Sequence, residues 1–383
     1  MAIPLMSVAQ VDSVPQKDVG DLLSHFFKSK KTDSVNKPAK KLIISVIPSA
    51  GYTLTTGYAV DLPANGAFYT SADHRENLSV ATADLSYDTR FQKIFVSRAE
   101  IWTPQNRYKL TWDVRWEQFP ENTFGIGTAT KPFQSDPLLF DFVKIYVNRY
   151  QKLTANYPVY FGFGYNLDYH YHIQETAVSA SSTTDFRTYG LTSSSASSGF
   201  NIDLLYDSRN NVINPLYGSY ASLIFTQNLH FLGSNTSWPA LQFDLRRYIR
   251  LSSKSHNILA LWAYAWFTWG EPPYLDLPFT GGDTYNNGGR GYIQGRFTGR
   301  NMLYLESEYR FGILKNGLLG GVFFVNAESL TEYHSNQFEH VAPAAGTGIR
   351  IKLNKKSDTN VSIDYGFGLY NSRGFFVNLG EVF

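Results

Sequence analysis

The sequence predicts an all-β protein, a sixteen-stranded antiparallel transmembrane β-barrel. Three observations support this prediction. Apolar and polar residues alternate over stretches of about 9–13 residues, long enough for a tilted strand to cross a bilayer. Aromatic residues make up 16 % of the 383 residues, whereas charged residues make up only 17 %. Short and long connections alternate along the chain, as the turns and loops at the two ends of outer-membrane barrels do.

Composition excludes several other classes of protein. The net charge of +2 gives no basic excess of the kind that nucleic-acid binding requires, so we expect no nucleic-acid partner. No apolar run reaches about 18 residues, so no helix is expected to span a bilayer. The chain has no cysteine, which excludes disulfides and thiolate zinc sites.

The N-terminal region divides into two segments before the barrel. Residues 1–9 are predicted to be the remnant of a signal peptide, because Ser7-Val8-Ala9 resembles a cleavage site after an apolar stub, although a basic start is missing. The alternative is an ordinary apolar N-terminus. Residues 10–40 are polar and basic and are interpreted as a periplasmic linker, in which residues 21–27 could form a short amphipathic turn. Residues 41–383 are assigned to the barrel.

Alternation with a period of two defines the strands. In Tyr108 to Glu117, tyrosine, leucine, tryptophan and valine side chains fall on one face, and Lys109, Asp113 and Arg115 fall on the other. The predicted strands start near Leu42, Gly57, Leu78, Phe91, Arg107, Phe140, Tyr157, Phe200, Gly218, Pro239, Asn257, Arg300, Leu318, Ala344, Asn360 and Phe375. An even number places both termini in the periplasm and the long loops outside.

A soluble β-sandwich also has strands with one apolar and one polar face. The barrel is favoured because the strands are long and because aromatic residues gather at strand ends, where the interfacial girdles of a membrane barrel lie. In this interpretation the apolar face contacts lipid and the polar face lines the lumen.

Polar residues of the predicted lumen were considered as sites for chemistry. Asp168, His170 and His172 alternate on one strand face and could bind a metal, but a polar lumen supplies such residues without any metal. No serine, histidine and aspartate set has a spacing that stands out from chance. The sequence therefore predicts no metal, no cofactor and no enzymatic activity.

A glycine-rich segment, residues 281–297 (GGDTYNNGGRGYIQGRF), places Arg290 between Gly289 and Gly291, followed by Tyr292. A phosphate-binding loop would lead into a helix, whereas a predicted strand follows here. The segment instead resembles the inward-folded loop of the BamA/TamA family of outer-membrane barrels, the bacterial surface antigen superfamily, whose tip is Arg-Gly-aromatic.

Other motifs resemble this family in order and spacing over residues 41–383. Residues 207–218 resemble a periplasmic turn in the middle of the barrel, and residues 308–311 resemble the strand after the tip loop. The last strand resembles the family's terminal signal strand, with Phe376, Gly380 and the final Phe383 in the matching positions.

The resemblance implies that Arg290 lies inside the lumen. In the family the tip arginine pairs with an aspartate in a Phe-x-Asp-x-Gly segment, but here Asn326 stands at that position. Leaving a buried charge without its partner costs about 3–5 kcal/mol. We therefore expect Glu306 and Glu308, on the lumen face of the next strand, to supply the counter-charge. The alternative is that Arg290 is a solvated loop residue.

The resemblance also suggests function. Family members that insert or export proteins carry periplasmic POTRA domains, and about 30 residues before the first strand are too few for even one, so a barrel-only member is expected. The favoured function is a component of outer-membrane protein or lipid assembly and translocation in the bacterial outer membrane. Its expected partners are outer-membrane lipid and lipopolysaccharide, and other assembly subunits could supply the periplasmic arm. The alternative is a plugged or passive pore.

Overall fold

The structure is a computed structural model that describes residues 15–26, 42–46, 49–53, 57–73, 75–176, 183–190, 192–252, 257–283, 286–355 and 357–383. The expected signal-peptide remnant, residues 1–9, lies outside these ranges, as does most of the expected linker. Within that linker, helix α1 (Val19–Phe26) forms where the sequence suggested an amphipathic turn.

Strands dominate the described chain. They are β1 (Leu42–Val46), β2 (Ser49–Thr53), β3 (Gly57–Asp61), β4 (Ala64–Phe68), β5 (Ser79–Asp88), β6 (Lys93–Trp102), β7 (Tyr108–Thr123), β8 (Asp136–Lys152), β9 (Val159–Glu175), β10 (Ser194–Asp207), β11 (Gly218–Asn228), β12 (Trp238–Arg250), β13 (Ile258–Thr268), β14 (Asn301–Gly312), β15 (Leu319–Leu330), β16 (Ala342–Asn354), β17 (Thr359–Phe367) and β18 (Arg373–Leu379).

Short helices occupy the connections. They are α2 (Asp185–Gly190) and the 3-10 turns η1 (Pro104–Asn106), η2 (Pro132–Gln134), η3 (His230–Leu232), η4 (Tyr274–Asp276) and η5 (Leu369–Asn371). Among the described residues, none of the helices has the length and apolar character needed to cross a bilayer.

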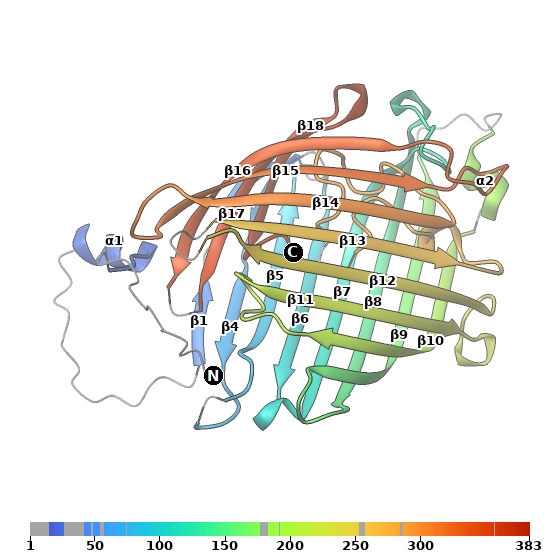
Figure 1. Cartoon of the computed structure of the whole chain (residues 1–383). Coiled ribbons are helices and arrows are strands. Elements are labelled where there is room, and N and C mark those ends of the chain that lie inside the picture. The colour runs from blue at the N-terminus through green and yellow to red at the C-terminus, as the bar shows by residue number, and fades with distance from the viewer. Residues whose placement is uncertain are drawn as a thin grey trace, which may run out of the picture.

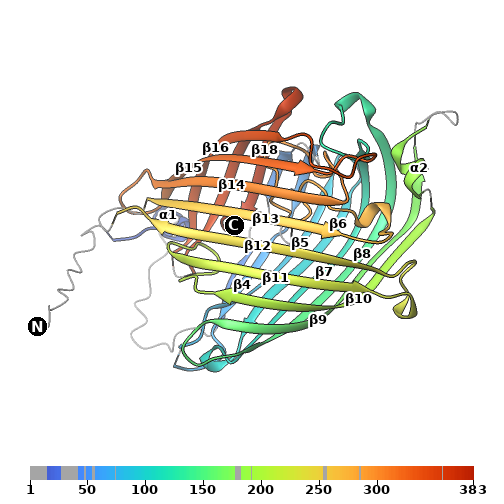
Figure 2. The ribbon, with the colours of Figure 1, turned by 45° about the vertical axis from the view of Figure 1, so that its right-hand side comes forward.

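The strands form one antiparallel sheet in which each strand from β5 to β18 pairs with the next along the chain. The sheet curls round on itself, so that β5 to β8 lie behind β11 to β14 (Figure 1). The same arrangement is visible after rotation, with α1 at one end of the strands and α2 at the other (Figure 2). The predicted all-β antiparallel architecture is therefore confirmed.

The first hairpin is interrupted on both sides without a change of register. Val46 of β1 pairs with Ala64 of β4, and Ser49 of β2 pairs with Asp61 of β3. The two residue numbers of each pair add to 110, which means that both pairs belong to the same antiparallel register. β1 and β2 therefore follow one line, and β3 and β4 follow the next. Pro63 separates β3 from β4, and it has no N–H to donate to the sheet.

The two faces of the sheet differ as the alternation predicts. On β7, Asp113, Arg115 and Glu117 are buried inside the curled sheet, whereas Leu110 and Trp116 are exposed on its outer face. Other strands repeat this pattern, with Leu303, Leu305, Phe323 and Val325 outside. An apolar outer face and a charged interior suit a sheet that is surrounded by lipid.

One prediction about the interior face is wrong. Asp168 and His170 lie inside, but the side chain of His172 is 73 % exposed. The cause is an irregularity in which the β8–β9 register shifts between Leu139 and Asp141 and His172 adopts a φ of 55°. A shift of one residue moves the following side chains to the other face. His172 instead contacts Asp141 at 2.8 Å.

Closure of the sheet involves its two ends. β18 is a neighbour of β2 in the sheet, but no residue-by-residue register joins them within the described ranges. A closed barrel of sixteen strands therefore stays a prediction at this seam.

Candidate functional site

The long connection between β13 and β14 folds into the interior of the sheet. Its tip depends on glycine, because Gly289 has a φ of 77° and Gly291 a φ of 114°, in a region that other residues rarely adopt. The amide of Tyr292 donates to the carbonyl of Gly289 at 3.0 Å and closes the turn. The two glycines thus allow the tight turn that carries Arg290 and Tyr292.

The tip packs closely against β16 and β17. A Cβ atom added to Gly291 would lie 2.8 Å from the Cβ of Ala344 and 3.0 Å from the carbonyl oxygen of Phe367. A Cβ added to Gly366 would lie 2.7 Å from the amide nitrogen of Gly291. Both positions need glycine because the loop backbone approaches the strand backbone directly.

Arg290 is buried, with 1 % of its surface exposed. Its guanidinium contacts the carboxylates of Glu306 and Glu308 on β14 and of Asp364 on β17. It also lies over the ring of Phe324, 3.8 Å from the ring centroid. The structure thus places Arg290 beside both glutamates that the sequence suggested, together with a third carboxylate that it did not.

Two further arginines extend this contact into a network. Arg310 contacts Glu308 at 2.6 Å, and Arg350 contacts Asp364 at 2.5 Å and Glu381 at 2.7 Å. Three guanidinium groups therefore share the carboxylates of Glu306, Glu308, Asp364 and Glu381. Glu306 also accepts a hydrogen bond from Tyr304. Arg350 contacts both carboxylate oxygens of Asp364, and a two-point contact of this kind fixes geometry as well as charge.

Asn326 has a different role from the aspartate it replaces. Its Nδ2 donates to the backbone carbonyl of Arg290 at 2.9 Å. The Asn326 amide therefore holds the backbone of the tip, whereas the carboxylates of Glu306, Glu308 and Asp364 neutralise the side chain of Arg290.

Tyr292 fixes the other side of the tip. It is buried, its hydroxyl donates to the carbonyl of Pro343 at 2.6 Å, and it accepts from the amide of Leu369 at 2.9 Å. Burial raises the pKa of Tyr292 to about 12, so the hydroxyl stays protonated and can donate.

The chain end enters the same interior. β18 ends at Leu379, and Gly380 turns the chain with a φ of 107°. The buried Phe383 then packs 5.2 Å from the ring of Trp262. This differs from the expected terminal strand, which would run as far as Phe383. Phe376 stays within β18, and the role of this end as a targeting signal stays a prediction.

Polar contacts tie the chain end to the tip loop. Arg310 donates to the carbonyl of Phe383 at 2.8 Å, and Asn287 donates to the carbonyl of Val382 at 2.7 Å. Burial alone would raise the pKa of Glu381, but the charges of Arg350 and Arg310 hold it below its usual range. Glu381 therefore stays ionised in the interior and links the chain end to the arginine network.

The turn near residues 207–218 lies beside this chain end. Arg209 forms a two-point contact with Asp207, at 2.9 and 2.8 Å, and the carbonyl of Ile213 accepts from the amide of Glu381 at 3.2 Å. The motif that suggested a mid-barrel turn is thus a folded turn that contacts the tail.

Four members of the site were missed from the sequence, namely Arg310, Arg350, Asp364 and Glu381. Asp364 lies on the polar face of an alternating strand, so its inward direction could have been predicted. Its pairing with a residue 74 positions earlier in the chain could not. Within the described residues, no group of histidine, cysteine, aspartate and glutamate side chains is arranged to hold a metal ion.

A curled antiparallel sheet with an apolar outer face, a charged interior and an arginine-tipped loop folded inside defines the class of β-barrels that carry an inward loop. The chain belongs to the Omp85 superfamily, whose superfamily domain matches residues 48–383. The comparison with curated protein sequences gives no match.

Solved structures show the same fold at low sequence identity. BamA from Haemophilus ducreyi lacking POTRA domains 1–3 is 14 % identical, with a TM-score of 0.54, over 87 % of this chain and 68 % of that one. CdiB from Acinetobacter baumannii is 13 % identical, with a TM-score of 0.57, over 90 % and 60 % of the two chains. CdiB from Escherichia coli is 12 % identical, with a TM-score of 0.56, over 89 % and 63 %. The chain thus spans less than two thirds of either CdiB.

Proposed function

We propose that this protein is a closed, sixteen-stranded barrel of the bacterial outer membrane that assembles or translocates proteins or lipids through the seam between its first and last strands. Membership of the Omp85 superfamily and the BamA-like and CdiB-like fold support this proposal. The register supports the count, because β1 with β2 and β3 with β4 each continue one line of the sheet.

The observation that carries the proposal is the uneven pairing of the sheet. β7 and β8 pair without interruption from Tyr108 to Thr123, whereas β18 has only 7 residues, and within the described ranges no residue-by-residue register joins it to β2. Backbone groups without partners in lipid cost several kcal/mol each, so strand pairs hold a barrel together in proportion to their length. The short seam is therefore the place where the wall separates most easily.

The interior loop fits this function. A loop that folds inside the curled sheet and is fixed to β14, β16 and β17 obstructs a path through the barrel. Transport along the seam requires no open lumen. The proposal involves no catalysis, and its partners are outer-membrane lipid, lipopolysaccharide and other assembly subunits that handle the substrate.

Purified protein in liposomes tests the proposal. We expect it to accelerate the membrane insertion of an unfolded outer-membrane barrel protein or the release of an exported polypeptide. Since the chain lacks cysteine, a disulfide introduced between β2 and β18 can lock the seam and should abolish this activity until it is reduced. A steady ion conductance, with neither activity and no effect of the lock, would instead support the passive pore.

A further inference from the structure

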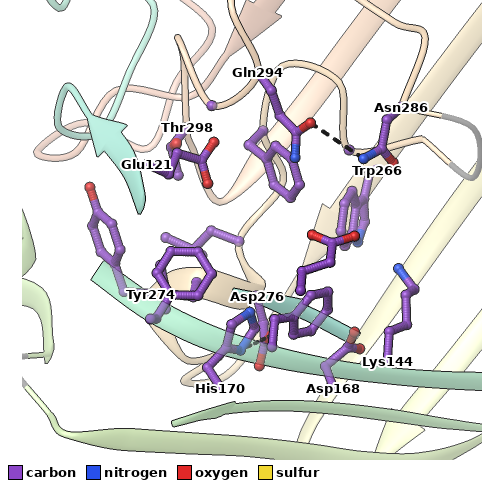
Figure 3. Close-up of a pocket in the computed structure, with 18 of the residues that line it drawn as sticks. Glu121, Lys144, Asp168, His170, Trp266, Tyr274, Asp276, Asn286, Gln294 and Thr298 are labelled. Carbon is purple, nitrogen blue, oxygen red and sulfur yellow. Dashed lines mark hydrogen bonds and ion pairs between the residues drawn. The ribbon is translucent and has the colours of Figure 1, made fainter. Parts of the chain in front are cut away.

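Inside the curled sheet, the chain supplies carboxylates close to its cations. The small interior cavity of about 110 Å³ is lined by Lys144 together with Asp168 and Glu121 (Figure 3). Elsewhere in the interior, Lys109 contacts Glu100 at 2.9 Å. A charge in surroundings of low polarity is costly unless an opposite charge lies near it. A cation on the outer face therefore also needs a counter-charge, from the chain or from the membrane.

Two arginines at one end of the outer face have no carboxylate partner. Arg107 directly precedes β7, Arg149 lies near the end of β8, and both side chains are exposed. Within the described residues, neither side chain forms an ion pair or a hydrogen bond. Arg149 lies opposite Leu110 of β7 and Phe163 of β9, whose side chains are exposed on the outer face. Residues opposite each other share a face of the sheet, so Arg149 also points outward.

The ring of Tyr108 brings the two guanidinium groups together. The guanidinium carbon of Arg107 lies 5.2 Å from the centroid of this ring, and that of Arg149 lies 4.6 Å from it. The two carbons are therefore no more than 9.8 Å apart, which is the sum of these distances. An aromatic face attracts a guanidinium group but carries no net charge. Two positive charges thus lie near each other without a counter-ion from the described chain.

The position of this pair along the strands suits the headgroup region of a membrane. Arg149 lies three residues before β8 ends at Lys152, which is about 10 Å along the strand. Arginine and tyrosine side chains at that depth place their polar ends among the headgroups. Further along β8 from Arg149, the next side chain on the outer face is Val147, which is apolar and exposed. The acyl chains of a lipid would pack there while its headgroup reaches the arginines.

A lipid phosphate is the chemical group that fits this pair. A phosphodiester carries one negative charge and two unesterified oxygens, and guanidinium groups bind phosphate oxygens through strong, charge-assisted hydrogen bonds. Because both arginine side chains are exposed, each can turn to reach one of these oxygens. A zwitterionic headgroup would add an ammonium group beside two cations that have no carboxylate partner in the described chain. The pair therefore favours a headgroup with a net negative charge.

We propose that Arg107, Tyr108 and Arg149 bind the phosphate of one anionic phospholipid, in the leaflet at the end of the barrel that carries the short turns. This proposal rests on the membrane barrel of the proposed function, which places that end in the periplasm. It does not depend on transport through the seam, because the site lies on the outer face of β7 and β8.

Native mass spectrometry of the full-length protein tests this proposal. The protein is stripped of lipid in a neutral detergent and mixed with phosphatidylglycerol, phosphatidylethanolamine, lipopolysaccharide or inorganic phosphate. We expect one phosphatidylglycerol molecule to stay bound to each chain at concentrations at which phosphatidylethanolamine does not. Inorganic phosphate should displace little of this lipid, because it lacks the contacts that the acyl chains add.

Variants locate the site. Arg107→Gln together with Arg149→Gln removes both charges, so we expect lipid binding to weaken at least about tenfold, the effect of losing one charge-assisted hydrogen bond. The matched control is Arg247→Gln, which should bind as the parent does. Arg247 is also exposed and lies three residues before β12 ends at Arg250, but its guanidinium donates to the hydroxyl of Ser219 at 2.6 Å. Heat-modifiability on gels verifies that each variant is folded.

A second double variant separates a shaped site from plain surface charge. Arg107→Lys together with Arg149→Lys keeps both charges but loses the planar groups that lie over Tyr108 and bind phosphate at two points. This variant should therefore retain less phosphatidylglycerol than the parent protein. Full retention would show that charge alone acts and would overturn the proposal.

Four other outcomes would also overturn the proposal. They are no lipid bound by the parent protein, equal retention of phosphatidylglycerol and phosphatidylethanolamine, the same loss in the Arg247→Gln control as in the double glutamine variant, or loss of lipopolysaccharide binding in that double variant, which would place the arginines in the other leaflet. Since no transport substrate is present, a parent protein that assembles or translocates its substrate but binds no lipid would reject this proposal alone.

Discussion

Replacing Arg290 by methionine removes the cation that three buried carboxylates share. Glu308 keeps Arg310 and Asp364 keeps Arg350, so the loss falls mainly on Glu306. That group can escape by binding a proton. Removing one partner of a buried ion pair costs about 3–5 kcal/mol, because it leaves a buried charge without compensation.

A loss of this size should release the tip loop without unfolding the sheet, whose backbone pairs are untouched. At about 1.36 kcal/mol for each factor of ten, the displaced loop becomes more than about a hundredfold more populated. Cleavage by chymotrypsin at Tyr292, which is buried in the parent protein, measures that population, since proteolysis follows the fraction of open molecules when opening is fast.

Matched variants make this test specific. Arg247→Met changes an arginine on the exposed face of β12 and should leave cleavage unchanged. The double variant Arg290→Met with Glu306→Gln removes the orphaned charge and should recover at least half of the protection. If Arg290→Met is cleaved no faster than Arg247→Met, Arg290 does not anchor the loop.

Four further predictions concern other parts of the structure. Gly291→Ala should displace the tip and raise chymotrypsin cleavage. The control is Gly317→Ala, which should not raise cleavage, because Gly317 also has a positive φ but has no atom within 4 Å of the added Cβ. Equal effects of the two variants would reject the argument from close contact. Val114→Arg, on the lipid-facing side of β7, should lower the free energy of unfolding in lipid by about 2–4 kcal/mol if the residue lies near the midplane. The inward Thr111→Arg should lower it less. Equal losses would mean that the two faces of β7 are assigned wrongly. The pKa of Glu381 is depressed in the folded state, so the contribution of Glu381 to stability is present above about pH 4.3 and is lost as the pH falls through the lower folded pKa. A spin label at Val382 should therefore become mobile in that acid range. A label that stays immobile there would contradict the role of Glu381 in holding the chain end. Deleting Val382 and Phe383 should sharply reduce the amount of inserted, heat-modifiable protein without affecting synthesis; normal insertion would show that the chain end is dispensable.

Much of the strand pattern could be predicted because a strand with two different surroundings must alternate. The inward direction of Glu306 and Glu308 follows from that period alone, and the structure places both against Arg290. His172 was misplaced because an irregularity in the sheet breaks the period at one residue, and no local composition marks it.

The chain end could not be predicted in the same way. The alternation of Phe375, Val377 and Leu379, together with the resemblance of the chain end to a terminal strand, suggests one unbroken strand as far as Phe383. Gly380 instead turns the chain inward, where Trp262 and Arg310 receive the last residue. These partners lie in β13 and β14, far from the chain end in the sequence. Their contacts with Phe383 arise only from the three-dimensional arrangement of the strands, so the sequence pattern does not reveal them.

Disulfide scanning of the seam in intact membranes tests the central claim most directly. Single cysteines are placed in pairs across residues 49–53 of β2 and 373–379 of β18, with Leu305→Cys and Ala327→Cys as the positive control, because these residues lie opposite each other in β14 and β15. Our account predicts that at least one seam pair cross-links and that oxidation stops assembly or translocation while reduction restores it. Cross-linking of the control pair with no seam pair reacting would contradict a barrel closed by β18 against its first strand.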